Sequence, residues 1–239
     1  MPDISIIVPV YNEADNVMPL CREVQAAMQK QQRSWELILV DDCSTDDTWK
    51  RVAEAHQLDN RIQGIRHLRN AGQSAAVWTG VQASASPIIA TLDGDLQNDP
   101  ADIPVMLPHL DNTDFVCGRR MNRRDTFVRR VSSRVARAAR KAVLKADFAD
   151  TGCAMRVFKR SAVDGILPFN GWHRFLPVLV HNNGAKTLEV PVNHRPRIAG
   201  VSKYGLANRL WRGIYDLMGV SWYQKRRLKV VPTERLQAK

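Results

Sequence analysis

The feature that most constrains the fold is an alternation of short, β-branched apolar runs with helical patterns in the first half of the 239-residue chain. The expected strands are Ile4–Val10, Glu36–Val40, Ile62–His67, Pro87–Leu92 and Asp114–Cys117. The expected helices between them are Ala14–Gln31, Asp46–Gln57 and Gln73–Ala83. Strands and helices that alternate at this spacing form right-handed crossovers, so the pattern predicts an α/β, Rossmann-like fold with a twisted, mainly parallel sheet flanked by helices.

Composition excludes several classes of protein. With 44% hydrophobic and 25% charged residues, the chain has the composition of a globular protein and not of a disordered one. No apolar run approaches the roughly 18–20 residues that a membrane-spanning helix needs, and we see no secretory signal. The four cysteines have no metal-ligand spacing, which favours reduced thiols in a cytoplasmic protein.

The net charge of +11 is unevenly distributed along the chain. Residues 1–118 hold 8 Lys/Arg and 17 Asp/Glu, whereas residues 119–145 hold 11 and 1, and residues 195–239 hold 11 and 2. Two basic stretches therefore follow an acidic front half, and such stretches attract polyanions. At this stage nucleic acid, an anionic membrane and a phosphorylated substrate are all open.

Acidic side chains follow three of the expected strands. The first strand ends in VPVYNE (Val8–Glu13), the second in VDDCSTDDT (Val40–Thr48) and the fourth in TLDGDLQNDP (Thr91–Pro100). Ligands of such sheets bind beyond the carboxyl ends of the strands, so these runs mark a candidate site. No GxGxxG follows the first strand, which removes the main support for a dinucleotide site.

Each of these carboxylates has a functional and a structural interpretation. Asp93 and Asp95 flank Gly94, and two carboxylates in a tight turn suit Mg2+ or Mn2+, whose remaining ligands would be phosphate and water. The alternative is a plain Asp-Gly turn between two elements. Asp42 and Glu13 are placed to hold a base or ribose, or simply to begin the helices that follow them.

Taken together and in this order, these motifs resemble glycosyltransferase family 2. Four further runs make the chain similar to the polyprenyl-phosphate glycosyltransferases, the relatives of dolichol-phosphate mannosyltransferase: VCGRRMNRRD, DTGCAMRVFKR, HRFLP and VPVNHRPRIAGVSKYG. The resemblance extends from about Ile4 to Trp222. It implies a GT-A fold and an inverting, metal-dependent transfer of a sugar from GDP-mannose or a UDP-sugar to a polyprenyl phosphate.

The resemblance also assigns roles to individual residues. Mg2+ or Mn2+ would be held by Asp93 and Asp95. The nucleotide sugar would be bound by Pro9, Tyr11, Glu13, Asp42, Asp93 and Gln97. The acceptor phosphate would be bound by Arg120, Arg123, Arg134, Ser202 and Lys203, and the residues that act in catalysis would be Asp95, Asp150, Arg120 and Lys203. A phosphate monoester is largely dianionic at neutral pH, so Asp150 is expected to orient cations or the donor sugar and not to remove a proton.

The basic stretches predict how the enzyme reaches its lipid. We expect a catalytic domain over residues 1–205, with a basic amphipathic helix within 119–145, and an amphipathic, membrane-associating segment over residues 206–239. Val128, Val131 and Val135 share one face of the first helix, as in a helix lying in a membrane interface, although a surface helix packed on the domain has the same pattern. A parallel basic stripe is formed by Arg130, Arg134, Arg137 and Lys141. The expected protein is peripheral, on the cytoplasmic face of an anionic inner or plasma membrane, and compatible with a homo-oligomer.

Three alternative functions differ in how well they fit the sequence. Nucleic-acid binding fits the basic charge, but the acidic strand ends would repel a phosphate backbone, so we expect no nucleic-acid partner. A family-2 transferase acting on a polysaccharide or another non-lipid acceptor is the stronger alternative. A non-catalytic structural role is disfavoured by the two intact carboxylates Asp93 and Asp95.

Overall fold

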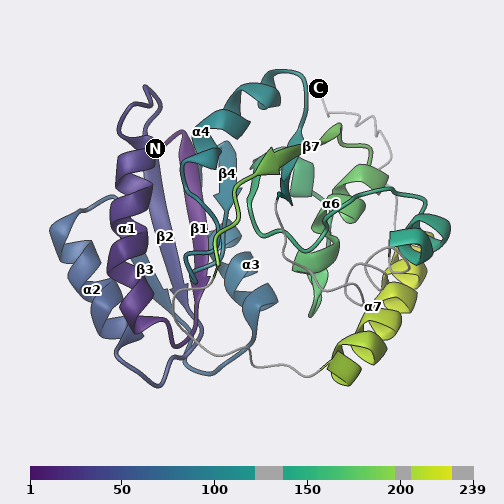
Figure 1. The fold of residues 1–239 in the computed structure, drawn as a ribbon, viewed down its shortest axis with the longest axis horizontal. Helices are drawn as coiled ribbons and strands as arrows, with labels where there is room; N and C mark the ends of the chain where they lie inside the picture. Colours follow the sequence, from purple (N-terminus) through teal and green to yellow (C-terminus); the bar gives the residue numbers. More distant parts are fainter. Residues whose placement is uncertain (122–136, 197–205, 228–239) are drawn as a thin grey trace, which may run out of the picture.

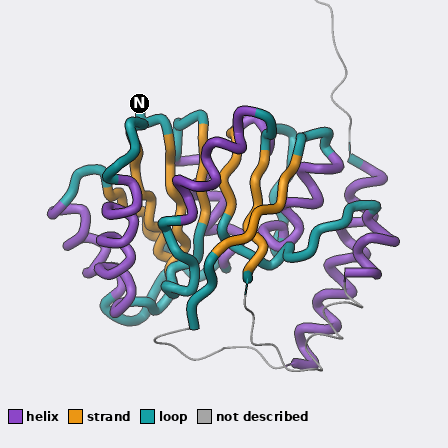
Figure 2. The backbone as a smooth tube through the Cα atoms, turned by 45° about the horizontal axis from the view of Figure 1, so that its top comes forward, coloured by secondary structure: helices purple, strands orange, loops and turns teal. Residues whose placement is uncertain are grey.

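The computed structural model describes residues 1–121, 137–196 and 206–227, apart from the side chains of residues 206–212. Within this part of the chain seven strands form one sheet, in the order β3-β2-β1-β4-β6-β5-β7 (Figures 1 and 2). The strands are β1 (Ile4–Val10), β2 (Trp35–Asp41), β3 (Ile62–Arg66), β4 (Ile88–Thr91), β5 (Phe115–Arg120), β6 (Arg156–Lys159) and β7 (Thr187–Val192). The helices are α1 (Ala14–Met28), α2 (Thr48–Leu58), α3 (Gln73–Ala83), α4 (Asp102–Met106), α6 (Trp172–Asn182) and α7 (Leu206–Arg226), with 3-10 turns η1 (Leu107–Asp111) and η2 (Arg160–Val163).

The mainly parallel sheet predicted from the sequence is confirmed. β1 pairs in parallel with β2 and β4, β2 pairs in parallel with β3, and β5 pairs in parallel with β7. The exception is β6, which runs antiparallel between β4 and β5. The carboxyl ends of β1, β2, β3 and β4 consequently meet at one edge of the sheet.

Alternation along β1 explains why helices cover both faces of the sheet. Ile4, Ile6 and Val8 pack with α1, α2 and α4 on one face, whereas Ile7 packs with α3 and α6 on the other. All four β1 side chains are fully buried, as expected for a central parallel strand covered on both faces. Figure 2 shows the sheet between these two helical layers.

Helix α7 lies against the outside of α6 (Figure 1). Leu217, Val220 and Tyr223 pack on the core, and the Tyr223 hydroxyl accepts a hydrogen bond of 3.0 Å from the Leu167 amide. Within the segment 206–239 that is expected to associate with a membrane, Tyr223 is therefore used inside the domain, through both its ring and its hydroxyl. No helix of the described residues is long and apolar enough to cross a bilayer.

The basic stretch 119–145 is only partly within the described residues. Arg119 and Arg120 end β5, and residues 137–144 are helical, whereas residues 122–136, which carry the predicted valine face, lie outside. Of the predicted basic stripe, Arg137 and Lys141 both contact Asp147, at 2.6 and 2.9 Å. These two cations are thus exposed and partly neutralised, as on a surface helix.

Candidate active site

The loops that follow β1 and β2 are fastened to each other. The main-chain amide of Asn12 donates a hydrogen bond to the Ser44 hydroxyl at 2.9 Å. In the other direction, the main-chain amide of Thr45 donates one to Asn12 Oδ1 at 2.8 Å. The Glu13 amide donates to the Thr48 hydroxyl at 2.8 Å. These hydrogen bonds satisfy main-chain N–H groups in the loop and at the start of α1 that would otherwise have no partner. The two loops are therefore held together without a ligand.

Asp42 organises a third loop at the same edge. Its Oδ1 accepts hydrogen bonds from the Ala71 amide and from the His67 ring, at 2.8 and 2.7 Å, and its Oδ2 accepts one from the Gly72 amide at 2.7 Å. The carboxylate is 3% exposed, so it bridges the end of β2 to the turn before α3 from within the fold. The predicted nucleotide contact of Asp42 is untested, and the structure adds this positioning role.

The Asp93–Gly94–Asp95 turn follows β4 and lies against the end of β1. A Cβ at Gly94 would lie 2.8 Å from Cγ1 of Val10 and 3.1 Å from the Pro9 carbonyl oxygen, so only glycine allows this approach. Gln73 donates to Asp93 Oδ1 at 2.7 Å, and the Gln97 amide donates to Asp95 Oδ1 at 3.2 Å. The turn therefore holds both carboxylates at the carboxyl edge of the sheet.

Gln97 and Asn98 connect this turn to the chain beyond β7. The Arg195 amide donates to the Gln97 carbonyl at 2.9 Å, and Asn98 forms an antiparallel bridge with His194. Arg195 also contacts Asp99 and Glu23, at 2.7 and 2.8 Å. Residues 197–205, which carry the predicted Ser202 and Lys203, begin just after this junction and lie outside the described residues.

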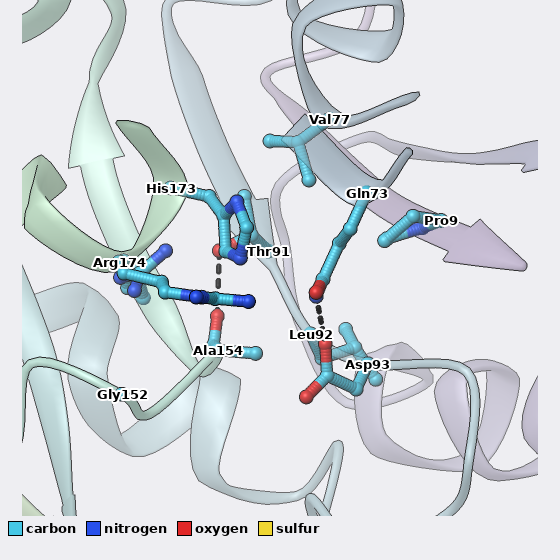
Figure 3. A pocket seen from close by; sticks show the side chains of 11 residues that line it. Pro9, Gln73, Val77, Thr91, Leu92, Asp93, Gly152, Ala154, His173 and Arg174 are labelled. Atoms are coloured by element: carbon cyan, nitrogen blue, oxygen red, sulfur yellow. Dashed lines mark hydrogen bonds between the residues drawn. The ribbon is translucent and has the colours of Figure 1, made fainter. Parts of the chain in front are cut away.

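Two adjoining cavities lie at this edge. The outer cavity, of about 340 Å3, is lined among others by Pro9, Tyr11, Glu13, Asp42, Asp93 and Asp95. The inner chamber, of about 170 Å3, is lined among others by Gln73, Asp93, Gly152, Arg156, His173 and Arg174 (Figure 3). Pro9, Gln73 and Asp93 line both, so the chamber lies directly behind the predicted nucleotide site.

Arg120 and Asp150 form a bidentate ion pair beside the inner chamber. Arg120 Nε and Nη2 donate to the two Asp150 oxygens at 2.7 and 2.8 Å, and the side chains are 20% and 8% exposed. The Glu189 carboxylate, on β7, accepts hydrogen bonds from the main-chain amides of Ala149 and Asp150 at 2.9 and 3.1 Å. These bonds fix the loop that carries Asp150. This is the arrangement that a cation-orienting Asp150 requires.

His173 lies in the first turn of α6 and faces the inner chamber (Figure 3). Its Nδ1 lies 2.6 Å from the Ser74 hydroxyl oxygen. The same oxygen accepts a hydrogen bond from the Gly171 main-chain amide at 2.8 Å. Burial and the neighbouring charges of Arg156 and Arg174 lower the pKa of His173 to about 3. The ring is therefore neutral at physiological pH and acts as a hydrogen-bonding group and not as a cation.

The donor set at the turn fits a hard divalent cation. Asp93 and Asp95 offer carboxylate oxygens, which are the ligands that Mg2+ and Mn2+ prefer. Across the described residues no three His, Cys, Asp or Glu side chains converge as a metal cage. Two carboxylates at the rim of a cavity therefore suit a cation that takes its remaining ligands from a bound phosphate and water.

The structure brings most of the predicted site residues together. Pro9, Tyr11, Glu13, Asp42, Asp93 and Asp95 line the outer cavity, Gln97 adjoins the turn, and Arg120 pairs with Asp150. Arg123, Arg134, Ser202 and Lys203 lie outside the described residues. The functional roles of all these residues remain predictions.

Sequence reasoning missed several residues of the site. Gln73, which contacts Asp93, stands in no run that was singled out. Arg156 and His173 stand within DTGCAMRVFKR and HRFLP, but the resemblance assigns neither of them a role in the site. Arg156 carries a signal, because it is a charged residue inside the otherwise apolar run Cys153–Phe158, whereas His173 stands next to Arg174 and carries none.

Comparisons with known proteins agree with the fold and with the resemblance. The chain is 37% identical over 231 residues to dodecaprenyl-phosphate galacturonate synthase of Rhizobium johnstonii, covering 93% of this chain and 68% of the relative. It is 34% identical over 217 residues to undecaprenyl-phosphate 4-deoxy-4-formamido-L-arabinose transferase of Salmonella paratyphi A, covering 90% and 66%. The chain thus spans about two thirds of the length of these curated relatives.

Solved structures match at the level of the fold. Glucosyl-3-phosphoglycerate synthase from Mycobacterium tuberculosis in complex with Mn2+, uridine diphosphate and phosphoglyceric acid superposes with a TM-score of 0.70 at 16% identity, covering 93% of this chain and 78% of that one. A complex of the same synthase with Mg2+ and uridine diphosphate superposes with a TM-score of 0.68 at 17% identity, covering 91% of this chain and 80% of that one. The fold is GT-A, and the model of the family described as glycosyl transferase family 2 matches residues 5–167. The chain belongs to glycosyl transferase family 2.

Proposed function

We propose that the protein transfers a sugar, with inversion, from a nucleotide-diphosphate sugar to a polyprenyl phosphate. The observation that carries the proposal is the Asp93–Gly94–Asp95 turn, which places two carboxylates on the rim of a cavity at the carboxyl edge of the sheet. The names of the curated relatives, which are polyprenyl-phosphate sugar synthases and transferases, support the acceptor class. Whether the donor is GDP-mannose or a UDP-sugar is left to experiment.

The donor half of the site is assigned to the outer cavity. Pro9, Tyr11, Glu13 and Asp42 would line the nucleotide, with Gln97 beside the diphosphate, and Asp93 and Asp95 would hold Mg2+ or Mn2+. When bound, the cation would stabilise the charge that develops on the leaving diphosphate. The hydrogen bonds within the three loops mean that this half is built before substrate binds, which reduces the entropy lost on binding.

The acceptor half is assigned to Arg120 and Asp150, with Arg123, Arg134, Ser202 and Lys203 as further predicted contacts. The acceptor phosphate already carries close to two negative charges at neutral pH, so it needs positioning and charge screening more than a base. Asp150 uses both of its oxygens to fix the Arg120 guanidinium. We therefore assign Arg120 to the phosphate and Asp150 to positioning Arg120.

We further propose that α7 touches the membrane surface and that the protein is peripheral, on the cytoplasmic face. Tyr215, Met218 and Trp222 are 78%, 67% and 66% exposed, and Lys225 and Arg226 follow them on the helix. Exposed aromatic and basic side chains on one helix suit the headgroup region of an anionic bilayer. The four cysteines are free thiols, which fits a reducing compartment.

A transfer assay tests the proposal. The purified chain would be incubated with undecaprenyl phosphate, Mn2+ and one of UDP-glucose, UDP-glucuronate or GDP-mannose, and the lipid-linked sugar would be measured by thin-layer chromatography. We expect D95N to lose transfer by at least about 100-fold, as for other groups that stabilise developing charge. D111N, at an exposed carboxylate of η1, is the matched control.

Two results would contradict the proposal. Wild-type transfer by D95N at saturating Mn2+ would remove the metal assignment. Sugar transfer to an oligosaccharide but not to undecaprenyl phosphate would favour the family-2 alternative with a non-lipid acceptor.

A further inference from the structure

Arg156 is a buried cation for which the described residues supply almost no partners. It begins β6, is 3% exposed and lines the inner chamber. Its Nη2 donates to the Thr151 carbonyl at 3.2 Å, and its Nε has no hydrogen-bond partner among the described residues. No described carboxylate lies within ion-pair distance of its guanidinium.

Such an arrangement is costly unless a ligand compensates for it. A buried charge without a counter-ion destabilises a fold strongly, and guanidinium groups stay protonated in proteins. Arg160, four residues further on, shows the usual solution, because its three nitrogens donate to the carbonyls of Ser86, Val81 and Ser84 at 2.9, 3.0 and 2.6 Å. Arg156 lacks this saturation and instead lines a cavity.

The other polar groups of the chamber also favour an anion. Arg174 lines it as a second cation. His173 lines it as a neutral ring whose Nδ1 is used by Ser74, which leaves Nε2 toward the chamber (Figure 3). The acid that lines it, Asp93, stands at the boundary with the outer cavity and belongs to the predicted metal site.

The size and place of the chamber select which part of the donor enters it. Its volume of about 170 Å3 is half that of the outer cavity, at about 340 Å3, so the smaller chamber suits a sugar ring better than a nucleoside with its diphosphate. The nucleotide is assigned to the outer cavity and the diphosphate to the turn between the two. The group that reaches past Asp93 is then the transferred sugar.

We propose that the inner chamber binds an acidic donor sugar, whose carboxylate pairs with Arg156 and accepts further hydrogen bonds from His173 and Arg174. The inference rests on the proposed function, because it assumes a nucleotide-diphosphate sugar in the outer cavity. It makes Arg156 a residue that determines specificity for a uronic acid or a similarly charged sugar. A planar carboxylate matches the two-pronged geometry of a guanidinium.

Calorimetric titration of four proteins with three ligands tests the inference. The proteins are wild type, R156Q, R156K and, as the matched arginine control, R160Q. The ligands are UDP, UDP-glucose and UDP-glucuronate, each with Mn2+; if GDP binds and UDP does not, the set becomes GDP, GDP-mannose and GDP-mannuronate. We expect wild type to bind the nucleotide-linked uronate at least tenfold more tightly than the nucleotide-linked neutral sugar. R156Q should lose this affinity ratio while keeping its affinity for the nucleoside diphosphate, and R160Q should keep the ratio.

Thermal unfolding without ligand gives a second measurement that does not depend on binding. We expect the midpoint of R156Q to equal or exceed that of wild type, because a buried charge with no ion pair among the described residues is removed. The midpoint of R160Q should fall, because the hydrogen bonds of Arg160 to Val81, Ser84 and Ser86 are lost. R156K keeps the charge and should retain part of the preference for the uronate.

Each contrary result has a distinct meaning. A ratio near one in wild type, or a ratio that survives in R156Q, overturns the acidic-sugar assignment while the transferase proposal stands. An equal loss of UDP and UDP-glucuronate affinity in R156Q assigns the arginine to the diphosphate and also overturns it. If neither UDP nor GDP binds wild type, the proposed function fails and the inference fails with it.

Discussion

Acidification should destabilise the protein through His173. The pKa of this ring is lowered to about 3 by burial and by the charges of Arg156 and Arg174, whereas an unfolded histidine titrates near 6.5. Between these values the unfolded state binds a proton that the folded state rejects, so stability increases with pH. The contribution of the neutral ring is fully present above about pH 6.5 and is lost as the pH falls toward 3.

The magnitude follows from the two pKa values. Lowering the pH from 7 to 5 should cost about 2 kcal/mol of the free energy of unfolding, because pH 5 lies about 1.5 units below the unfolded pKa. The result is insensitive to the folded value, since raising the folded pKa by one unit changes the loss by only about 0.1 kcal/mol.

Urea denaturation of wild type and H173N at pH 7, 6 and 5 measures this effect, with tryptophan fluorescence as the signal. Asparagine is the chosen replacement because its side-chain oxygen takes the place of Nδ1 beside the Ser74 hydroxyl. All other ionisable groups are shared, so their contributions cancel in the difference between the two proteins. We expect wild type to lose about 2 kcal/mol more than H173N between pH 7 and 5; parallel losses would refute the assignment of a neutral His173.

Three further predictions concern the architecture of the site. G94A should destabilise the fold by about 1–3 kcal/mol in urea denaturation, because the added methyl group would lie 2.8 Å from a valine side chain of β1. D150N should cost about 3 kcal/mol in the same assay, because it leaves the Arg120 guanidinium, 20% exposed, without its counter-ion; an unchanged midpoint would mean that the pair is not maintained in solution. D42N should speed hydrogen exchange at the Gly72 amide by roughly tenfold or more, since a charge-assisted bond of about 1.5–3 kcal/mol is weakened; unchanged exchange would show that the loop is held by other contacts.

The first half of the fold could be predicted because its signals are local. Ile4–Val10 is predicted and observed with the same limits, and β2 to β4 differ from prediction by a residue or two at their ends. In each, an apolar run of strand length is followed by turn residues or by a helical pattern, so the period changes at the boundary. The second half lacks such runs. β6 has four residues, and its antiparallel place between β4 and β5 depends on pairings between distant segments, which no local pattern specifies.

The candidate site divides in the same way. Asp93, Asp95 and Asp42 could be predicted because each follows a strand whose carboxyl end must lie at the shared edge. The pairing of Arg120 with Asp150 could be proposed only from the family resemblance, since thirty residues separate them along the chain. Gln73 and Arg156 could not be assigned, because the neighbours that give them a role come from other elements of the fold.

Departures from ordinary folding rules concentrate around these same loops. Asn12, Cys43 and Leu96 have φ of 54°, 63° and 60°, a conformation that non-glycine residues seldom adopt, and they fall in the loops after β1, β2 and β4. Among the described residues, the buried guanidinium of Arg156 makes a single hydrogen bond, although Arg160 shows that the same stretch of chain can saturate a guanidinium. Strain and a buried charge without an ion pair reduce stability, so their presence together beside adjoining cavities is expected where binding and not folding determines the residue. By this argument the inner chamber belongs to the site as much as the carboxylate turn does, and Arg156 is the residue through which a ligand would recover stability that the free protein gives up.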